Sequence, residues 1–136
     1  MPTPAPNVVV TITPTTPACL TTSPATPIAT GMNTPTAVAS DDVHLAAADT
    51  YNNRVLIWNS LPSSMNHPPD VVVGQTSFTS KSFPGHIPAA SSLRGPGGVW
   101  IQGGKLFIAD TQNDRVLIYN SIPTANGAGP TQHDDI

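Results

Sequence analysis

Apolar residues gather in short runs along this chain, and each run is bounded by Gly, Pro, Asn, Asp or Ser. The runs are rich in Val, Ile and Leu, and none has the apolar spacing of an amphipathic helix. Nearly every position within a run is apolar, so the strands are expected to be covered on both faces. The pattern predicts strands near residues 7–12, 36–40, 44–49, 54–59 and 70–75, and again near 98–102, 105–110, 115–120 and from 134 onward.

Two parts of the chain repeat one another. DTYNNRVLIWNSLP begins at Asp49 and DTQNDRVLIYNSIP begins at Asp110, and ten of their fourteen positions are identical. The same offset of 61 residues aligns Pro35 with Pro96 without a gap. The chain therefore contains two copies of one structural unit.

The repeat predicts the domain organisation. A diverged first unit starts in residues 1–33, with a strand at 7–12 and a Thr/Pro-rich loop; a disordered linker over 1–30 is the alternative. HDDI at the end of the sequence is similar to the PPDV that opens the strand at 70–75, so the last strand is expected to begin near residue 134. The units occupy residues 34–75 and 97–136, separated by a long irregular loop at 76–96.

Four short antiparallel strands per unit, buried on both faces, are typical of a β-propeller blade. Gly103-Gly104 predicts a tight hairpin turn within the second unit. The predicted fold class is therefore all-β, with propeller blades that form an incomplete ring in one chain, since propellers use about four to eight blades. A stacked β-solenoid is the alternative. Further blades from a parent chain, or identical subunits, would complete the ring.

The units resemble the NHL repeat, in particular its long bacterial form. That repeat runs through Pro, a Gly-Val strand, a Leu-Tyr-Val-Ala-Asp-Thr strand and Asn-Asn-Arg-Val. The first unit has Ala37 in place of the glycine, and PDVVVGQTSFTS resembles the extra strand of long units. The resemblance covers about 100 residues and implies a propeller, without implying one activity. The second unit retains Pro96, Gly98, Val99, Leu106, Ala109, Asp110, Thr111, Asn113, Arg115 and Val116; the first retains Pro35, Val38, Leu45, Ala48, Asp49, Thr50, Asn52, Asn53, Arg54 and Val55.

The repeated Asp-Thr-x-Asn-x-Arg motif predicts a turn between two strands. Its aspartate can accept backbone N–H bonds, its asparagine tolerates left-handed backbone, and the arginine falls opposite the aspartate as an ion-pair partner. A catalytic or metal site is the alternative, but such a site ordinarily occurs once and this motif occurs twice. The residues assigned to the structural turn and ion pair are Asp49, Asn52, Arg54, Asp110, Asn113 and Arg115.

Composition narrows the function classes. The net charge is −3, and the five Lys and Arg residues are scattered, so no nucleic-acid partner is expected. There is no Glu, the four His lie far apart, and Cys19 is the single cysteine. We therefore expect no catalytic residues, no metal and no cofactor. We expect no membrane-spanning segment, and the first ten residues lack the basic and long apolar regions of a secretory leader. The Thr, Ser, Asn and Pro content favours a secreted or cell-surface protein, whose signal would have been removed or would lie on a longer parent chain.

Loop 76–96 is the best candidate for a ligand surface, because exposed loops on a rigid scaffold commonly carry binding sites. The aromatic residues Trp58, Trp100 and Tyr119 are expected to pack between blades. The predicted function is a non-enzymatic module that binds protein or carbohydrate at a cell surface. The alternatives are a fragment of an NHL-like lyase or hydrolase with its catalytic residues in other blades, and a structural subunit of a larger extracellular assembly. The candidate ligand residues are Phe78, Phe83, His86 and Arg94.

Overall fold

The computed structural model describes residues 27–82 and 89–135. Within these ranges the chain forms two four-stranded antiparallel sheets and no α-helix, so the predicted all-β class is confirmed. A 3-10 turn joins the second strand of each sheet to the third: η1 (Thr50–Asn52) and η2 (Thr111–Asn113). The first sheet has the order β1 (Pro35–Ser40), β2 (Leu45–Asp49), β3 (Arg54–Trp58) and β4 (Val71–Val73), and the second has β5 (Gly98–Gln102), β6 (Lys105–Asp110), β7 (Arg115–Tyr119) and β8 (Gln132–Asp135). The predicted strand at 7–12 and Cys19 lie outside the described residues.

The two sheets have the same strand register. Ala47 pairs with Leu56 in the first sheet, and the residues 61 positions later, Ile108 and Leu117, pair in the second. The outermost pairs follow the same rule, because Leu56 faces Val72 and Leu117 faces His133. Residues 61 positions apart are therefore structurally equivalent, and we call them counterparts below.

The predicted start of the last strand near residue 134 is wrong, because β8 begins at Gln132. The similarity between HDDI and PPDV had aligned Asp135 with Asp70, but the hydrogen bonds align Thr131 with Asp70. The Asp70 amide donates to the Ile57 carbonyl at 2.8 Å, and the Thr131 amide donates to the Ile118 carbonyl at the same distance. Backbone pairing with β7 sets this register. The polar strand β8 therefore occupies the position in the second sheet that β4, a strand of three valines, occupies in the first.

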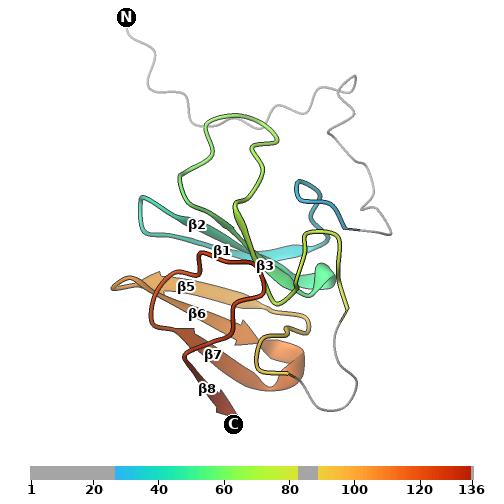
Figure 1. Cartoon of the computed structure of the whole chain (residues 1–136), viewed down its shortest axis with the longest axis vertical. Helices are drawn as coiled ribbons and strands as arrows, with labels where there is room; N and C mark the ends of the chain where they lie inside the picture. The colour runs from blue at the N-terminus through green and yellow to red at the C-terminus, as the bar shows by residue number, and fades with distance from the viewer. Residues whose placement is uncertain (1–26, 83–88, 136) are drawn as a thin grey trace, which may run out of the picture.

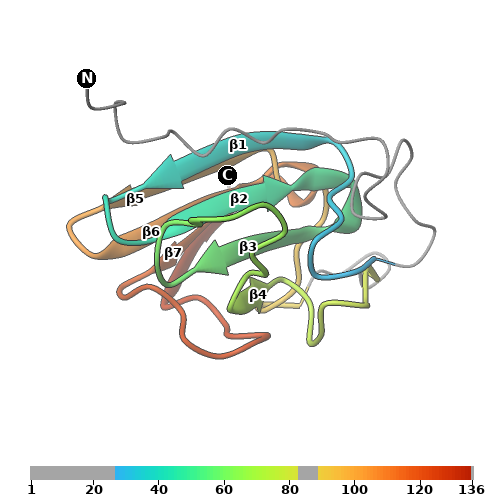
Figure 2. The same ribbon diagram turned by 90° about the horizontal axis from the view of Figure 1, so that it is seen from above.

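The two sheets stack face to face (Figures 1 and 2), and β1 and β2 approach β5 most closely. Between them lies the main core, made of buried apolar side chains from both sheets together with Leu93 from the loop that precedes β5. A smaller cluster covers the opposite face of the first sheet, with Leu45 and Phe78 packed against it. The main core contains Ala46, Val55, Ile57, Val71, Val73, Leu93, Ile101, Leu106, Ile108, Leu117 and Tyr119; the smaller cluster contains Ala47, Leu56, Trp58 and Val72.

Two of the three aromatic residues differ from the prediction. Tyr119 is 3% exposed and lies in the core between the sheets. Trp58 is 6% exposed but belongs to the smaller cluster on the outer face of the first sheet, and Trp100 is 60% exposed. Successive side chains of a strand point to opposite faces, and both Val99 and Ile101 contribute to the core between the sheets. Trp100 therefore faces away from the first sheet, and its indole N–H donates to the Gln102 Oε1 at 3.0 Å.

Candidate functional site

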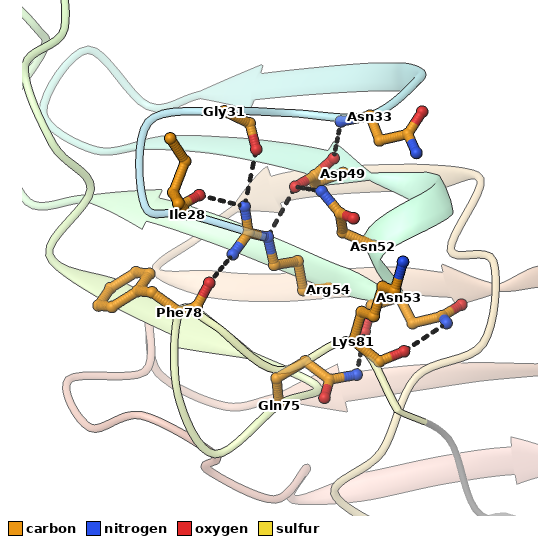
Figure 3. Close-up of polar contacts among 10 residues, drawn as sticks. All are labelled: Ile28, Gly31, Asn33, Asp49, Asn52, Asn53, Arg54, Gln75, Phe78 and Lys81. Atoms are coloured by element: carbon orange, nitrogen blue, oxygen red, sulfur yellow. Dashed lines mark hydrogen bonds and ion pairs between the residues drawn. The ribbon is translucent and has the colours of Figure 1, made fainter. Parts of the chain in front are cut away.

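The Asp49 carboxylate is the centre of a buried polar network in the first sheet (Figure 3). It accepts hydrogen bonds from the Arg54 Nε at 2.6 Å, the Asn52 side-chain amide at 3.0 Å and the Asn33 backbone amide at 2.6 Å. Both charged side chains of the ion pair are fully buried. Asp49 ends β2 and Arg54 begins β3, and the register places them directly opposite each other. The sequence spacing therefore produces the predicted contact.

The rest of the Arg54 guanidinium binds backbone carbonyls. Nη1 donates to Phe78 at 2.5 Å, and Nη2 donates to Ile28 at 2.8 Å and Gly31 at 3.1 Å. These bonds attach two loops, one on each side of the turn, to the same side chain (Figure 3). The network is thus an anchor for the loops around η1.

The second sheet repeats this arrangement. Arg115 Nε lies 2.8 Å from Asp110, whose carboxylate also accepts from the Asn113 side chain and the Arg94 amide, at 2.9 Å and 2.7 Å. Arg115 Nη2 donates to the carbonyls of Ala89 and Ser92, which are the counterparts of Ile28 and Gly31. Because the same bonds form in both sheets and bind the charged groups internally, the network has the chemistry of a structural anchor.

The left-handed position of each turn is not the asparagine singled out from the sequence. Asn52 and Asn113 bond the aspartates, and the following residues, Asn53 and Asp114, have a φ of 54°. Asn53 also joins the two sheets, because its Oδ1 accepts from the Gly95 amide at 2.8 Å. Both Asn and Asp adopt left-handed backbone more readily than other non-glycine residues. The Asn at position 53 and the Asp at position 114 could therefore have indicated the left-handed position of each turn.

The structure describes two of the four predicted ligand residues, Phe78 and Arg94, and their backbones belong to different networks. Phe83 and His86 lie outside the described residues. Phe78 packs against the smaller apolar cluster of the first sheet, and its carbonyl binds Arg54. The Arg94 backbone belongs to the Asp110 network of the second sheet. Loop 76–96 is therefore anchored near both ends by the two networks.

A hollow of about 750 Å³ lies on the outer face of the first sheet, and sequence reasoning did not predict it. Its lining is mostly apolar, and the Trp58 indole N–H donates to the His67 carbonyl at 2.8 Å at one side. The lining residues come from β1, β2, the end of β3, the loop after β3 and the segment before β1. They are Ala29, Thr30, Met32, Pro35, Thr36, Ala37, Val38, Leu45, Ala47, Trp58, Pro62, Ser64, Met65, Asn66 and His67.

The pKa values of two groups, Asp41 and Tyr119, are shifted by their surroundings in the fold. Asp41 caps the turn between β1 and β2, and its pKa is lowered to about 2, first by the His44 backbone amide and then by the His44 ring. Burial, and secondarily the charge of Asp110, raises the pKa of Tyr119. Among residues 27–82 and 89–135, no group of three or more His, Cys, Asp or Glu side chains could hold a metal ion. No helix in the same ranges is long and apolar enough to cross a membrane.

No protein-family model matches this chain, and no curated protein matches it. The resemblance to NHL repeats therefore remains an interpretation of the motif residues in the two units.

Proposed function

We propose that this protein is a non-enzymatic, NHL-like β-propeller module that acts as a protein- or carbohydrate-binding scaffold at a cell surface. The observation that carries the proposal is the duplicated Asp–Asn–Arg network. In each copy the buried carboxylate and guanidinium are engaged by neighbouring backbone and side-chain groups. A general acid or base needs a proton-donating or proton-accepting atom within reach of a substrate, whereas these atoms hold loops on a sheet.

The arrangement of the two sheets supports their interpretation as propeller blades. Blades of four antiparallel strands radiate from a central channel, so neighbouring blades approach most closely at their first strands. Here β1 and β2 lie closest to β5. Leu93 fills space between the sheets near the opposite edge, where the chain leaves β4 and an isolated bridge joins Gly74 to Ser92. In a stacked solenoid, neighbouring sheets would be expected to lie equally close along both edges.

The binding surface in this proposal is loop 76–96. The Arg54 network holds its first part through the Phe78 carbonyl, and the Asp110 network holds its last part through the Arg94 amide. A loop fixed at both ends loses less conformational entropy when it binds a ligand. Its aromatic and cationic side chains are suited to stacking on sugar rings or on peptide side chains.

The proposal is tested with a glycan array and a phage-displayed peptide library, followed by hydrogen exchange with the best ligand. We expect protection of amides in 76–96 and at least about a tenfold weaker affinity for Phe83→Ala/His86→Ala, equivalent to about 1.4 kcal/mol. Thr124→Ala, on the loop that follows β7, is the matched control and should bind normally. Saturable Ca²⁺ or Zn²⁺ binding, or hydrolysis of aryl esters, would instead favour the lyase or hydrolase alternative. Protection elsewhere on the protein would contradict the assignment of the loop.

One observation favours the structural-subunit alternative as a second function: both sheets have an outer face with incompletely covered apolar side chains.

A further inference from the structure

Counterpart residues on one face of the two sheets differ in burial: they are buried in the first sheet and partly exposed in the second. Phe107, Ala109, Val116 and Ile118 on the outer face of the second sheet are partly exposed, whereas their counterparts Ala46, Ala48, Val55 and Ile57 are fully buried. Ala46, Val55 and Ile57 belong to the core between the sheets, and Ala48 pairs with Val55 on the same face. We call this face of either sheet its A face and the opposite one its B face. The A face of the second sheet is therefore a surface of the kind that another sheet covers inside the chain.

The B face shows the reverse relation. Leu106, Ile108 and Tyr119, on the B face of the second sheet, belong to the core between the sheets. Their counterparts Leu45, Ala47 and Trp58 line the 750 Å³ hollow of the first sheet. Leu93 is fully buried between the sheets, and its counterpart Met32 is 37% exposed at the hollow. The hollow thus occupies the place where an A face lies in the internal interface.

The loop after the third strand of the second sheet hydrogen-bonds the outer edge of β4 in the first sheet, and the same loop of the first sheet has a similar backbone. In the second sheet, Asn126 and Gly127 cover the free edge of β4: the Asn126 Oδ1 accepts from the Val72 amide at 3.0 Å, and the Gly127 amide donates to the Val72 carbonyl at 2.9 Å. Gly127 has a φ of 71°, and its counterpart Asn66 has a φ of 61°. Asn66 lines the hollow. The backbone of its loop can therefore make the Gly127 contact with the fourth strand of another sheet, whereas Met65 stands in the place of Asn126.

Side-chain volumes are complementary between the two outer faces. In the internal interface the A face supplies the small Ala46, and the B face supplies the large Ile108. On the outer surfaces the A face supplies the large Phe107, and the B face supplies the small Ala47. Close packing tolerates exchanges that conserve total volume, so this reversal keeps the two outer faces compatible.

We propose that the second sheet of one chain docks through its A face into the hollow on the first sheet of a second copy, reproducing the internal interface. Two polar contacts of that interface would recur. The Thr50 hydroxyl donates to the Pro96 carbonyl at 2.7 Å, and Asn53 accepts from Gly95. Their counterparts across the new interface are Thr111 with Pro35, and Asp114 with Thr34, whose φ of 53° matches the 52° of Gly95.

This contact is heterologous, because each copy uses two different surfaces. Head-to-tail contacts repeated with a constant rotation close into a ring or continue as a filament. Because propeller blades are related by rotation about one axis, we expect a closed ring of a few copies.

The test measures mass by sedimentation equilibrium of the full chain and two variants. Val38→Asp places a charge on the exposed edge of the B face, because Val38 is the counterpart of Val99, which packs against the core between the sheets. Phe107→Asp does the same on the A face, and Val116→Lys is a second A-face variant should Phe107→Asp fail to fold by circular dichroism. Val43→Asp is the matched control, since this valine of the same hairpin is 57% exposed at the turn, compared with 65% for Val38.

We expect the wild type and Val43→Asp to form a defined oligomer, and Val38→Asp and Phe107→Asp each to be monomeric. An equimolar mixture of the two monomeric variants should form a dimer and nothing larger, because only one intact A face and one intact B face remain. A monomeric wild type, a mixture that stays monomeric, or a small molecule occupying the hollow of a monomer in native mass spectrometry would overturn the proposal. Ligand binding by loop 76–96 is measured on monomeric Val38→Asp, so the scaffold proposal and this inference can fail separately.

Discussion

Removal of the buried Asp49 carboxylate is expected to be the most damaging single change in the polar network. Asp49→Ala leaves the Arg54 guanidinium buried with three backbone carbonyls and no opposite charge. Breaking a buried ion pair by deleting one partner costs about 3–5 kcal/mol. Since domains of this size are stable by about 5–15 kcal/mol, the variant should lose a large part of its free energy of unfolding.

The assay is urea denaturation followed by circular dichroism, with the slope m compared among variants. Asp110→Ala is expected to destabilise less than Asp49→Ala, because Arg115 is 4% exposed and its counterpart is fully buried. Lys105→Ala, at an exposed turn, should change stability by no more than about 0.5 kcal/mol.

A double-mutant cycle with Arg54→Ala separates the pair from its surroundings. Asp49→Ala/Arg54→Ala should cost clearly less than the sum of the single variants, since the second substitution removes the unpaired charge. A cost below about 1 kcal/mol for Asp49→Ala, or strict additivity in the cycle, would refute the structural role assigned to the network.

Three further outcomes follow from single sites. Gly74→Ala should cost about 3 kcal/mol in urea unfolding, because Gly74 has a φ of 92° and an added Cβ would lie 2.5 Å from the buried Leu93; Gly104→Ala, with a φ of 75° and open space around it, should cost about 1 kcal/mol, and equal costs would contradict the packing argument. Carboxyl NMR should give Asp41 a midpoint near pH 2. Because this folded-state pKa lies below the ordinary aspartate value of 3.8, the stabilisation is present above pH 3.8 and is lost as the pH falls through about 2; His44→Ala should raise the midpoint, and an unchanged midpoint would exclude the ring as a contributor. In the monomeric Val38→Asp background, Trp58→Ala should cost about 3–5 kcal/mol through lost packing and the lost bond to His67, whereas Trp100→Ala, at a 60% exposed position, should have little effect by the same urea assay.

Much of the local structure is encoded in short segments of the sequence. The Gly103-Gly104 pair adopts left-handed backbone at both positions, as a two-residue hairpin turn requires. The Asp and Arg residues of each motif meet because antiparallel pairing across a short turn places them opposite each other. These outcomes depend on neighbours within a few residues, so residue type and spacing were sufficient to predict them.

Other features depend on distant parts of the chain. Val99, Trp100 and Ile101 are all apolar, so their sequence does not show which face of β5 packs against the first sheet. The exposure of Trp100 could therefore not be predicted. The start of β8 at Gln132 is set by pairing with β7, whereas sequence similarity favoured a later start. The link from Asn53 to Gly95 spans 42 positions and exists only once the sheets stack.

The repeat in the sequence is sufficient to predict two equivalent all-β units among the described residues, because segments of matching sequence and spacing form the same strands, turns and ion pairs. Which surfaces those units bury against each other, and which they leave uncovered, depends on how the two sheets pack. Phe107 and Ala46 occupy the same place in their units, yet one is partly exposed and the other is fully buried. Burial is a property of what lies across a face, and this depends on the relative positions of whole sheets.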